Sequence, residues 1–92
     1  MRDFNDIIKE AYQDTGRSDL WLACALQIEA AELAELIMKK HGYGTPFDQD
    51  DLKSEAGDVL NFVAAILWKH GLTIEDAMKS NEQKLRKRGW IS

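Results

Sequence analysis

The chain has 92 residues, enough for one domain but not for two separate hydrophobic cores. Its hydrophobic content of 45% excludes a disordered chain, and its net charge of −4 argues against a general nucleic-acid binder, which needs a basic face. A single cysteine, Cys24, excludes an intramolecular disulfide and a cysteine-based zinc site. No apolar run approaches the ~18 residues of a membrane span, and the acidic N-terminus is unlike a signal peptide. We therefore expect a cytoplasmic protein with no membrane or nucleic-acid partner.

Two helices are predicted in the first half of the chain. The first has apolar side chains at the spacing of one helical face and ends at Gly16. Those side chains are Phe4, Ile7, Ile8, Ala11 and Tyr12. The second covers residues 19–41, with Ser18 as a candidate N-cap and Gly42 as its end.

Two further helices follow a loop of residues 41–49. Asp50 is a candidate cap for a third helix, which continues to about His70. Thr73, with Asp76 three residues later, starts a fourth helix in a variant of the capping box. No alternating strand pattern occurs. The sequence thus predicts an all-α fold in which residues 1–92 form a single, four-helix bundle-like domain with antiparallel neighbours.

Carboxylates on the second helix lie where apolar residues are expected. Successive helical residues are about 100° apart, so a residue and its third neighbour share a face. Glu29 lies at the centre of the main apolar stripe, and Glu32 lies about 60° to one side. The stripe consists of Leu22, Leu26, Leu33 and Leu36. Glu35 lies further out, near the edge of the stripe.

The third helix repeats this arrangement. Glu55 is central in an apolar stripe, and Asp58 follows one turn later on the flank that corresponds to Glu32. The stripe consists of Leu52, Val59, Phe62 and Ile66. If the two helices pack as an antiparallel pair, all four carboxylates converge at one position.

Four clustered carboxylates need compensation by protons, basic side chains or cations, because burial and mutual repulsion both disfavour their charged forms. Oxygen ligands without Cys or His suit Mg²⁺ or Mn²⁺ better than Zn²⁺. The alternative is a solvated acidic strip, since Glu-x-x-Glu pairs are common on helix surfaces. The flanking leucines and the repetition on a second helix favour a metal site.

These acids resemble a known family signature. The runs Glu29-Ala30-Ala31-Glu32 and Glu55-Ala56-Gly57-Asp58 are similar to the Glu-x-x-Glu … Glu-x-x-Asp motif of MazG-like nucleoside triphosphate pyrophosphohydrolases, members of the all-α NTP pyrophosphatase superfamily. The similarity extends over residues 19–90 and includes a terminal helix with Asn, Lys and Arg. Two positions depart from the family pattern and bear on substrate choice: Ile28 replaces a frequent Glu, and Trp21 replaces a small polar residue.

The resemblance implies Mg²⁺-dependent cleavage, with Mn²⁺ as a substitute, between the α- and β-phosphates of an NTP or dNTP. The products would be a nucleoside monophosphate and pyrophosphate. Carried over by position, the implied metal ligands are Glu29, Glu32, Glu55 and Asp58, and the implied substrate-binding residues are Asn81, Lys84 and Arg88. The family fold is a helical bundle that usually assembles as a dimer or a tetramer.

The residues themselves agree with this chemistry. Phosphoryl transfer requires charge neutralisation and positioning more than covalent help from protein. Lys84 and Arg88 are one turn apart and share a face with Asn81, which makes them candidates for phosphate contacts. Glu35 or one of the four metal ligands would orient the attacking water.

The second helix is apolar on nearly every side, which indicates a homodimer or a homotetramer, because one small domain cannot cover all of its faces. The additional apolar residues are Leu20, Ile28, Ala31, Ala34 and Met38. Four aromatic side chains are available either for base stacking or for core and interface packing. They are Trp21, Phe47, Trp68 and Trp90.

Two other functions compete with this hypothesis. One is phosphoribosyl-ATP pyrophosphohydrolase, from the same superfamily and of similar size. The other is a non-catalytic helical oligomerisation or regulatory module, in which the acids pair with Lys84 and Arg88 and no Mg²⁺ is needed. A di-iron bundle is disfavoured because neither histidine lies three residues after a Glu.

Overall fold

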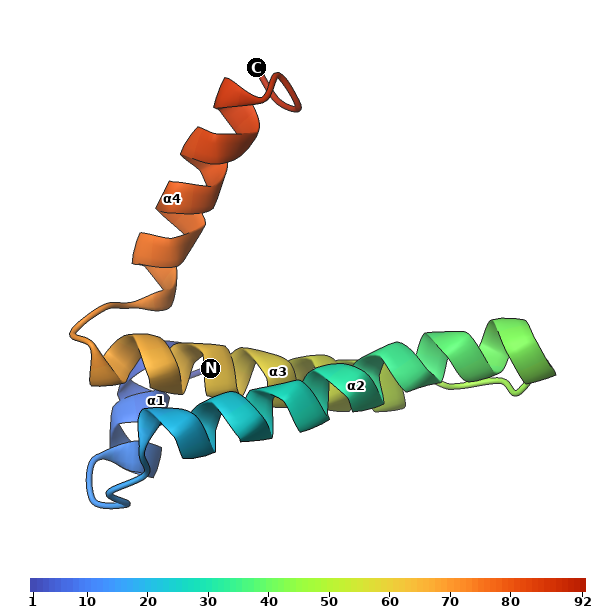
Figure 1. The fold of residues 1–92 in the computed structure, drawn as a ribbon, viewed down its shortest axis with the longest axis horizontal. Helices are drawn as coiled ribbons and strands as arrows, with labels where there is room; N and C mark the ends of the chain where they lie inside the picture. Colours follow the sequence, from blue (N-terminus) through green and yellow to red (C-terminus); the bar gives the residue numbers. More distant parts are fainter.

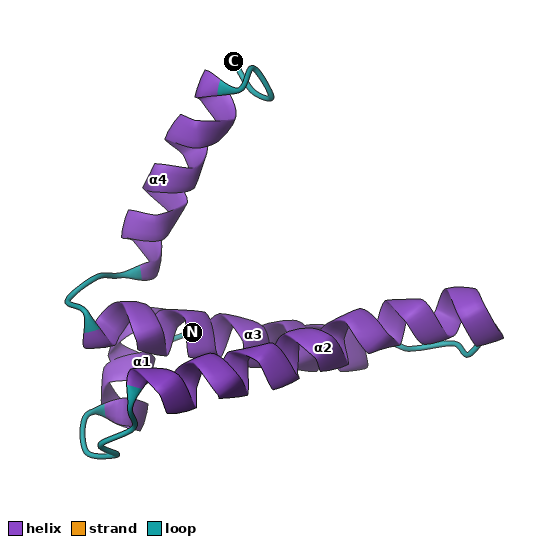
Figure 2. Ribbon diagram, in the orientation of Figure 1, coloured by secondary structure: helices purple, strands orange, loops and turns teal.

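Four α-helices and no strand make up the computed structural model, which describes residues 1–92. The helices are α1 (Phe4–Tyr12), α2 (Asp19–Tyr43), α3 (Gln49–Lys69) and α4 (Ile74–Lys87), joined by short loops (Figure 2). The prediction of an all-α fold with four helices is confirmed. None of these helices combines the length and apolar character needed to cross a membrane.

Side-chain caps set the helix starts. Ser18 caps α2 as predicted, and its Oγ accepts a hydrogen bond from the Trp21 amide at 3.0 Å. Thr73 and Asp76 form a complete capping box at the start of α4. The expected cap of α3 is wrong by two residues, because Asp48 rather than Asp50 accepts the hydrogen bond that closes the first turn.

The end of α2 also differs from the prediction. The helix continues through Gly42 and ends at Gly44, whose φ of +68° is a left-handed conformation that only glycine adopts without steric cost. The amide of Gly44 donates to the Lys39 carbonyl and thereby satisfies one of the free carbonyls of the last turn. This extension adds surface to the far end of α2.

Helices α2 and α3 run side by side in opposite directions, and α1 packs across them near the start of α2 and the end of α3 (Figure 1). Their shared core is small. Only four side chains are fully buried: Ile8, Leu22, Ala64 and Ala65. The apolar stripes that carry the acids face each other between α2 and α3, with partly buried side chains such as Leu33 and Val59.

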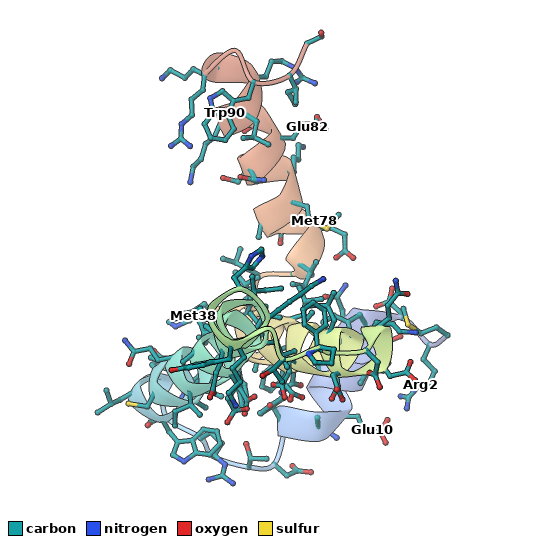
Figure 3. The ribbon with its side chains drawn as sticks, turned by 90° about the vertical axis from the view of Figure 1, so that its right-hand side faces the viewer. Arg2, Glu10, Met38, Met78, Glu82 and Trp90 are labelled. Carbon is teal, nitrogen blue, oxygen red and sulfur yellow. The ribbon has the colours of Figure 1, made fainter.

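Helix α4 projects away from the other three helices (Figures 1 and 3). Its first turn is tied to α1 by a hydrogen bond of 2.8 Å from Asn5 Nδ2 to Glu75 Oε2. Further along, Met78 has 62% of its surface exposed, and Trp90 beyond the helix has 73%. A four-helix bundle is therefore not completed within one chain, because the turn at Gly71 (φ +75°) directs α4 outward.

The chain exposes more surface than a compact protein of its size. Its accessible surface is 7031 Å², whereas a compact monomer of 10.5 kDa would expose about 5,400 Å². The radius of gyration is 15.5 Å, against about 12.3 Å for a compact domain of this length. Exposed apolar side chains on the outer side of α2 add to this surface, including Leu20, Ile28 and Met38.

Candidate metal centre

The antiparallel packing of α2 and α3 brings three carboxylates together. Glu29, Glu32 and Glu55 each offer one oxygen, and these oxygens lie within 4.8 Å of one another. Glu29 and Glu55 are partly buried between the helices, whereas Glu32 is exposed at the edge of the contact. The helical periodicity that predicted this convergence is therefore confirmed for three of the four acids.

Two carboxylate oxygens in this cluster lack a partner. Glu29 Oε2 and Glu55 Oε2 are shielded from solvent and make no hydrogen bond. Buried polar atoms are nearly always paired, so an unpaired oxygen on each of two facing acids indicates a missing partner. None of the six ion pairs in the chain involves the cluster.

This absence of ion pairs bears on the non-catalytic alternative. Pairing of the acids with Lys84 and Arg88 does not occur within the chain, because Lys84 lies on the projecting helix α4 and Arg88 directly follows it (Figures 1 and 3). The acids are thus left without basic compensation from their own chain. Protons or a cation remain as the compensating charges.

The electrostatics of the cluster favour uncharged or cation-bound carboxyl groups. Burial raises the pKa of the Glu29 carboxyl, and the negative charges of Glu32 and Asp58 raise it further. The pKa of the Glu55 carboxyl is raised by burial first and by the same two neighbours second. A divalent cation would oppose both shifts, because its positive charge stabilises the charged form of each carboxylate.

Asp58 stands slightly apart from the other three acids. It lies one turn after Glu55 on α3 and is exposed, and it is not among the oxygens that converge within 4.8 Å. Its charge nevertheless contributes to the raised pKa values of Glu29 and Glu55, which places it next to the cluster. The structure therefore assembles three predicted ligands and leaves Asp58 beside them.

The donor set fits a hard divalent cation. All donors are carboxylate oxygens, the ligand type that Mg²⁺ and Mn²⁺ prefer. Three such oxygens within 4.8 Å of one another could together hold one cation between α2 and α3.

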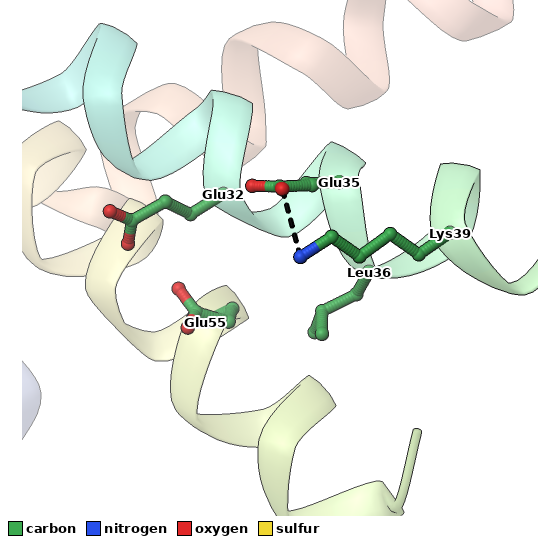
Figure 4. A pocket seen from close by; sticks show the side chains of 5 residues that line it. All are labelled: Glu32, Glu35, Leu36, Lys39 and Glu55. Atoms are coloured by element: carbon green, nitrogen blue, oxygen red, sulfur yellow. Dashed lines mark ion pairs between the residues drawn. The ribbon is translucent and has the colours of Figure 1, made fainter. Parts of the chain in front are cut away.

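A cavity of about 380 Å³ opens beside the cluster (Figure 4). It is lined by Glu32, Glu35, Leu36, Lys39 and Glu55. Two of these residues, Glu32 and Glu55, also belong to the acid cluster. Lys39 is its only basic side chain and forms an ion pair of 2.9 Å with Glu35. Lys39 was not among the predicted site residues, although its position seven residues after Glu32 places it on the same helical face.

The substrate-binding residues predicted on α4 lie elsewhere. Asn81, Lys84 and Arg88 are exposed on or directly after the projecting helix, and the chain does not bring them to its own acids (Figure 1). The expectation that they contribute to the same site therefore does not hold within a single chain. The physical reason is the outward direction of α4.

One aromatic candidate lies in a defined cluster near the start of α2. The Trp21 ring packs edge-on against Phe62 with centroids 6.0 Å apart, and the Arg17 guanidinium lies 3.9 Å above the Trp21 ring. Phe62 in turn packs edge-on against Tyr12. Trp21 is 41% exposed, so part of its ring remains open to a ligand or a partner.

Comparison with known families agrees with the fold and with the acids. The family model of the MazG nucleotide pyrophosphohydrolase domain matches residues 17–89, which is most of the chain. The chain therefore belongs to the MazG family of nucleotide pyrophosphohydrolases. No curated protein and no solved structure matches it significantly.

Proposed function

We propose that this chain hydrolyses nucleoside triphosphates of the cytoplasm, NTP or dNTP, to the corresponding monophosphate and pyrophosphate, with Mg²⁺ as the cofactor. The observation that carries the proposal is the unpaired carboxylate cluster, two of whose oxygens are buried without a partner, beside an open cavity. Membership of the MazG family supports a nucleotide as the substrate.

In this proposal the acids hold the metal ion. Glu29, Glu32 and Glu55 would bind it directly, and Asp58 would complete the set from the next turn of α3. The bound cation supplies charge neutralisation for the phosphates and activates water. The part-burial of Glu29 and Glu55 limits their rotation, so the metal-binding oxygens are held in place before the substrate arrives.

Glu35 has a separate place in the cavity. Its carboxylate lines the wall without being one of the converging oxygens. It is therefore available to accept a hydrogen bond from the attacking water and to orient it toward a phosphate.

We further propose that the chain acts as a homodimer or a homotetramer. The projecting α4 of one copy would then place Asn81, Lys84 and Arg88 next to the acids of another copy, where these side chains could bind the phosphates. The large exposed surface and the apolar outer side of α2 support assembly of this kind.

The proposal predicts the products and the substrate class. Incubation with Mg²⁺ and each of the common NTPs and dNTPs should release pyrophosphate and a nucleoside monophosphate, separable by ion-exchange chromatography. Release of orthophosphate with a nucleoside diphosphate would contradict cleavage between the α- and β-phosphates. Turnover of phosphoribosyl-ATP alone would assign the chain to the histidine-pathway alternative.

A further inference from the structure

Lys39 is the one basic side chain that a single chain places at the cavity. It lies two helical turns after Glu32 on α2, and its ammonium group points back along the helix toward Glu35 (Figure 4). The cavity extends from this ammonium group to Glu32 and Glu55, two members of the acid cluster. A ligand anchored at the cluster can therefore reach Lys39 without any movement of the helices.

We propose that Lys39 binds the phosphates of the nucleotide and exchanges its ion pair with Glu35 for this contact. The inference rests on the function proposed above, because it assigns a phosphate-binding residue to that same site. The ligand class is a metal-bound polyphosphate, and the contact is a charge-assisted hydrogen bond from Lys39 Nζ to a phosphate oxygen.

The charges that line the cavity support this role. Three carboxylates and one ammonium group face it, so the empty cavity repels an anion. A divalent cation at the cluster would offset part of this negative charge, and Lys39 supplies a positive charge at the other end of the cavity. A polyphosphate would then meet a cation at one end of the cavity and an ammonium group at the other.

Breaking the ion pair between Lys39 and Glu35 costs little free energy. The Lys39 and Glu35 side chains are 51% and 56% exposed, and they lie at the i, i+4 spacing of an ordinary surface ion pair. Pairs of this kind contribute little to stability because solvent screens them. A polyphosphate presents several anionic oxygens to Lys39, so one of them can replace the solvent-screened Glu35 carboxylate. The displaced carboxylate then faces the cavity, where the proposed function places a water.

Lys40 provides a matched control on the same turn of α2. Its ammonium group lies 5.2 Å from the centre of the Phe47 ring and does not line the cavity. Lys39→Met and Lys40→Met remove the same charge from adjacent residues near the end of the helix. Any difference between the two variants therefore reports the position of the charge and not its loss.

The test measures binding of inorganic tripolyphosphate in the presence of Mg²⁺ by calorimetry, together with KM for the best nucleotide. Lys39→Met should weaken tripolyphosphate binding and raise KM by about tenfold, as expected for loss of one charge-assisted contact. Lys39→Arg should restore most of the affinity, and Lys40→Met should match the unmodified protein. Affinity for Mg²⁺ alone should not weaken in Lys39→Met, whereas a merely structural role would weaken both.

Two results would overturn the inference. Equal tripolyphosphate affinities for Lys39→Met and Lys40→Met, in a protein that still hydrolyses nucleotides, would reject the role of Lys39 and leave the proposed function intact. Absence of both nucleotide hydrolysis and Mg²⁺-dependent tripolyphosphate binding in the unmodified protein would reject the inference and the proposed function together.

Discussion

Glu29 and Glu55 occupy positions on the contacting faces of α2 and α3 that an ordinary helix pair would fill with apolar side chains. Each has one oxygen that is shielded from solvent and makes no hydrogen bond. Keeping such oxygens charged is unfavourable, and the raised pKa of each carboxyl reflects this. The unpaired acids should therefore weaken the protein, and the cation of the proposed function would relieve this cost.

This balance predicts a pH dependence of stability. In the metal-free protein the raised pKa means that the folded state binds more protons than the unfolded state above the ordinary value of 4.5. The contribution of these two carboxyls to the free energy of unfolding should therefore be fully present below pH 4.5 and should be lost as the pH rises through the raised pKa. Glu55→Gln, which stays uncharged, should lose less stability over the same range.

Urea denaturation with a chelator at pH 4.5, 6 and 7.5 would check this prediction. The stability difference in favour of Glu55→Gln should grow with pH, and Mg²⁺ at pH 7.5 should stabilise the unmodified protein more than the variant. A difference that stays constant with pH would contradict a raised pKa for Glu55.

The positions of these acids could be predicted because helical periodicity is a local property. An acid between leucines at i, i+3 and i+4 spacing must share their face, whatever the rest of the fold. Asp58 is less determined, since its distance from the other acids depends on how closely α2 and α3 approach. Lys39 was missed because a lysine near a helix C-terminus is also explained by the helix dipole.

At the scale of helices, the sequence predicted each element and most of its ends. Capping by Ser18 and Thr73 is confirmed because each hydroxyl has a single helix start within reach. The ends near the loop of residues 41–49 moved by about two residues. Two aspartates and two glycines compete there, and the path of the loop selects Asp48 and Gly44.

Helix α4 is the element that sequence reasoning placed least well. Ile74, Ala77 and Leu85 give it an apolar face, and periodicity predicts that such a face is covered. Periodicity does not specify whether the same chain or another copy covers it. In the structure α4 projects away from the other three helices. The position of Lys84 and Arg88 relative to a set of acids therefore depends on how copies of the chain assemble.

The whole molecule exposes roughly 1,600 Å² more surface than a compact monomer of its mass. A standard protein interface buries about 800 Å² on each partner, so the excess is sufficient for two interfaces on every chain. Exposed apolar side chains on α2 and α4 lie on this excess surface. The shape of the chain is thus consistent with assembly through more than one face.

Disruption of the outer face of α2 should separate the copies. Met38 is 69% exposed on that face, and Met38→Glu would place a charge in an apolar interface, which is costly to bury. Light scattering coupled to size-exclusion chromatography should show a dimer or a tetramer for the unmodified protein and a smaller species for the variant. Gln49→Glu, which adds the same charge at the exposed start of α3, should leave the mass unchanged. A monomeric unmodified protein would contradict the proposed assembly.

The central claim is that the carboxylate cluster binds the cation on which hydrolysis depends. The most direct test is the rate of pyrophosphate release as a function of Mg²⁺ concentration for the unmodified protein, Glu55→Gln and Glu10→Gln. Glu10 is an exposed acid on α1 that pairs with Arg2 outside the cluster, so its variant serves as the control. Loss of a metal ligand should reduce the rate by about 100-fold or more, since loss of even a supporting residue costs about 10–100-fold. The account predicts this loss for Glu55→Gln alone, with no release in the absence of a divalent cation. Full Mg²⁺-dependent turnover by Glu55→Gln would contradict it.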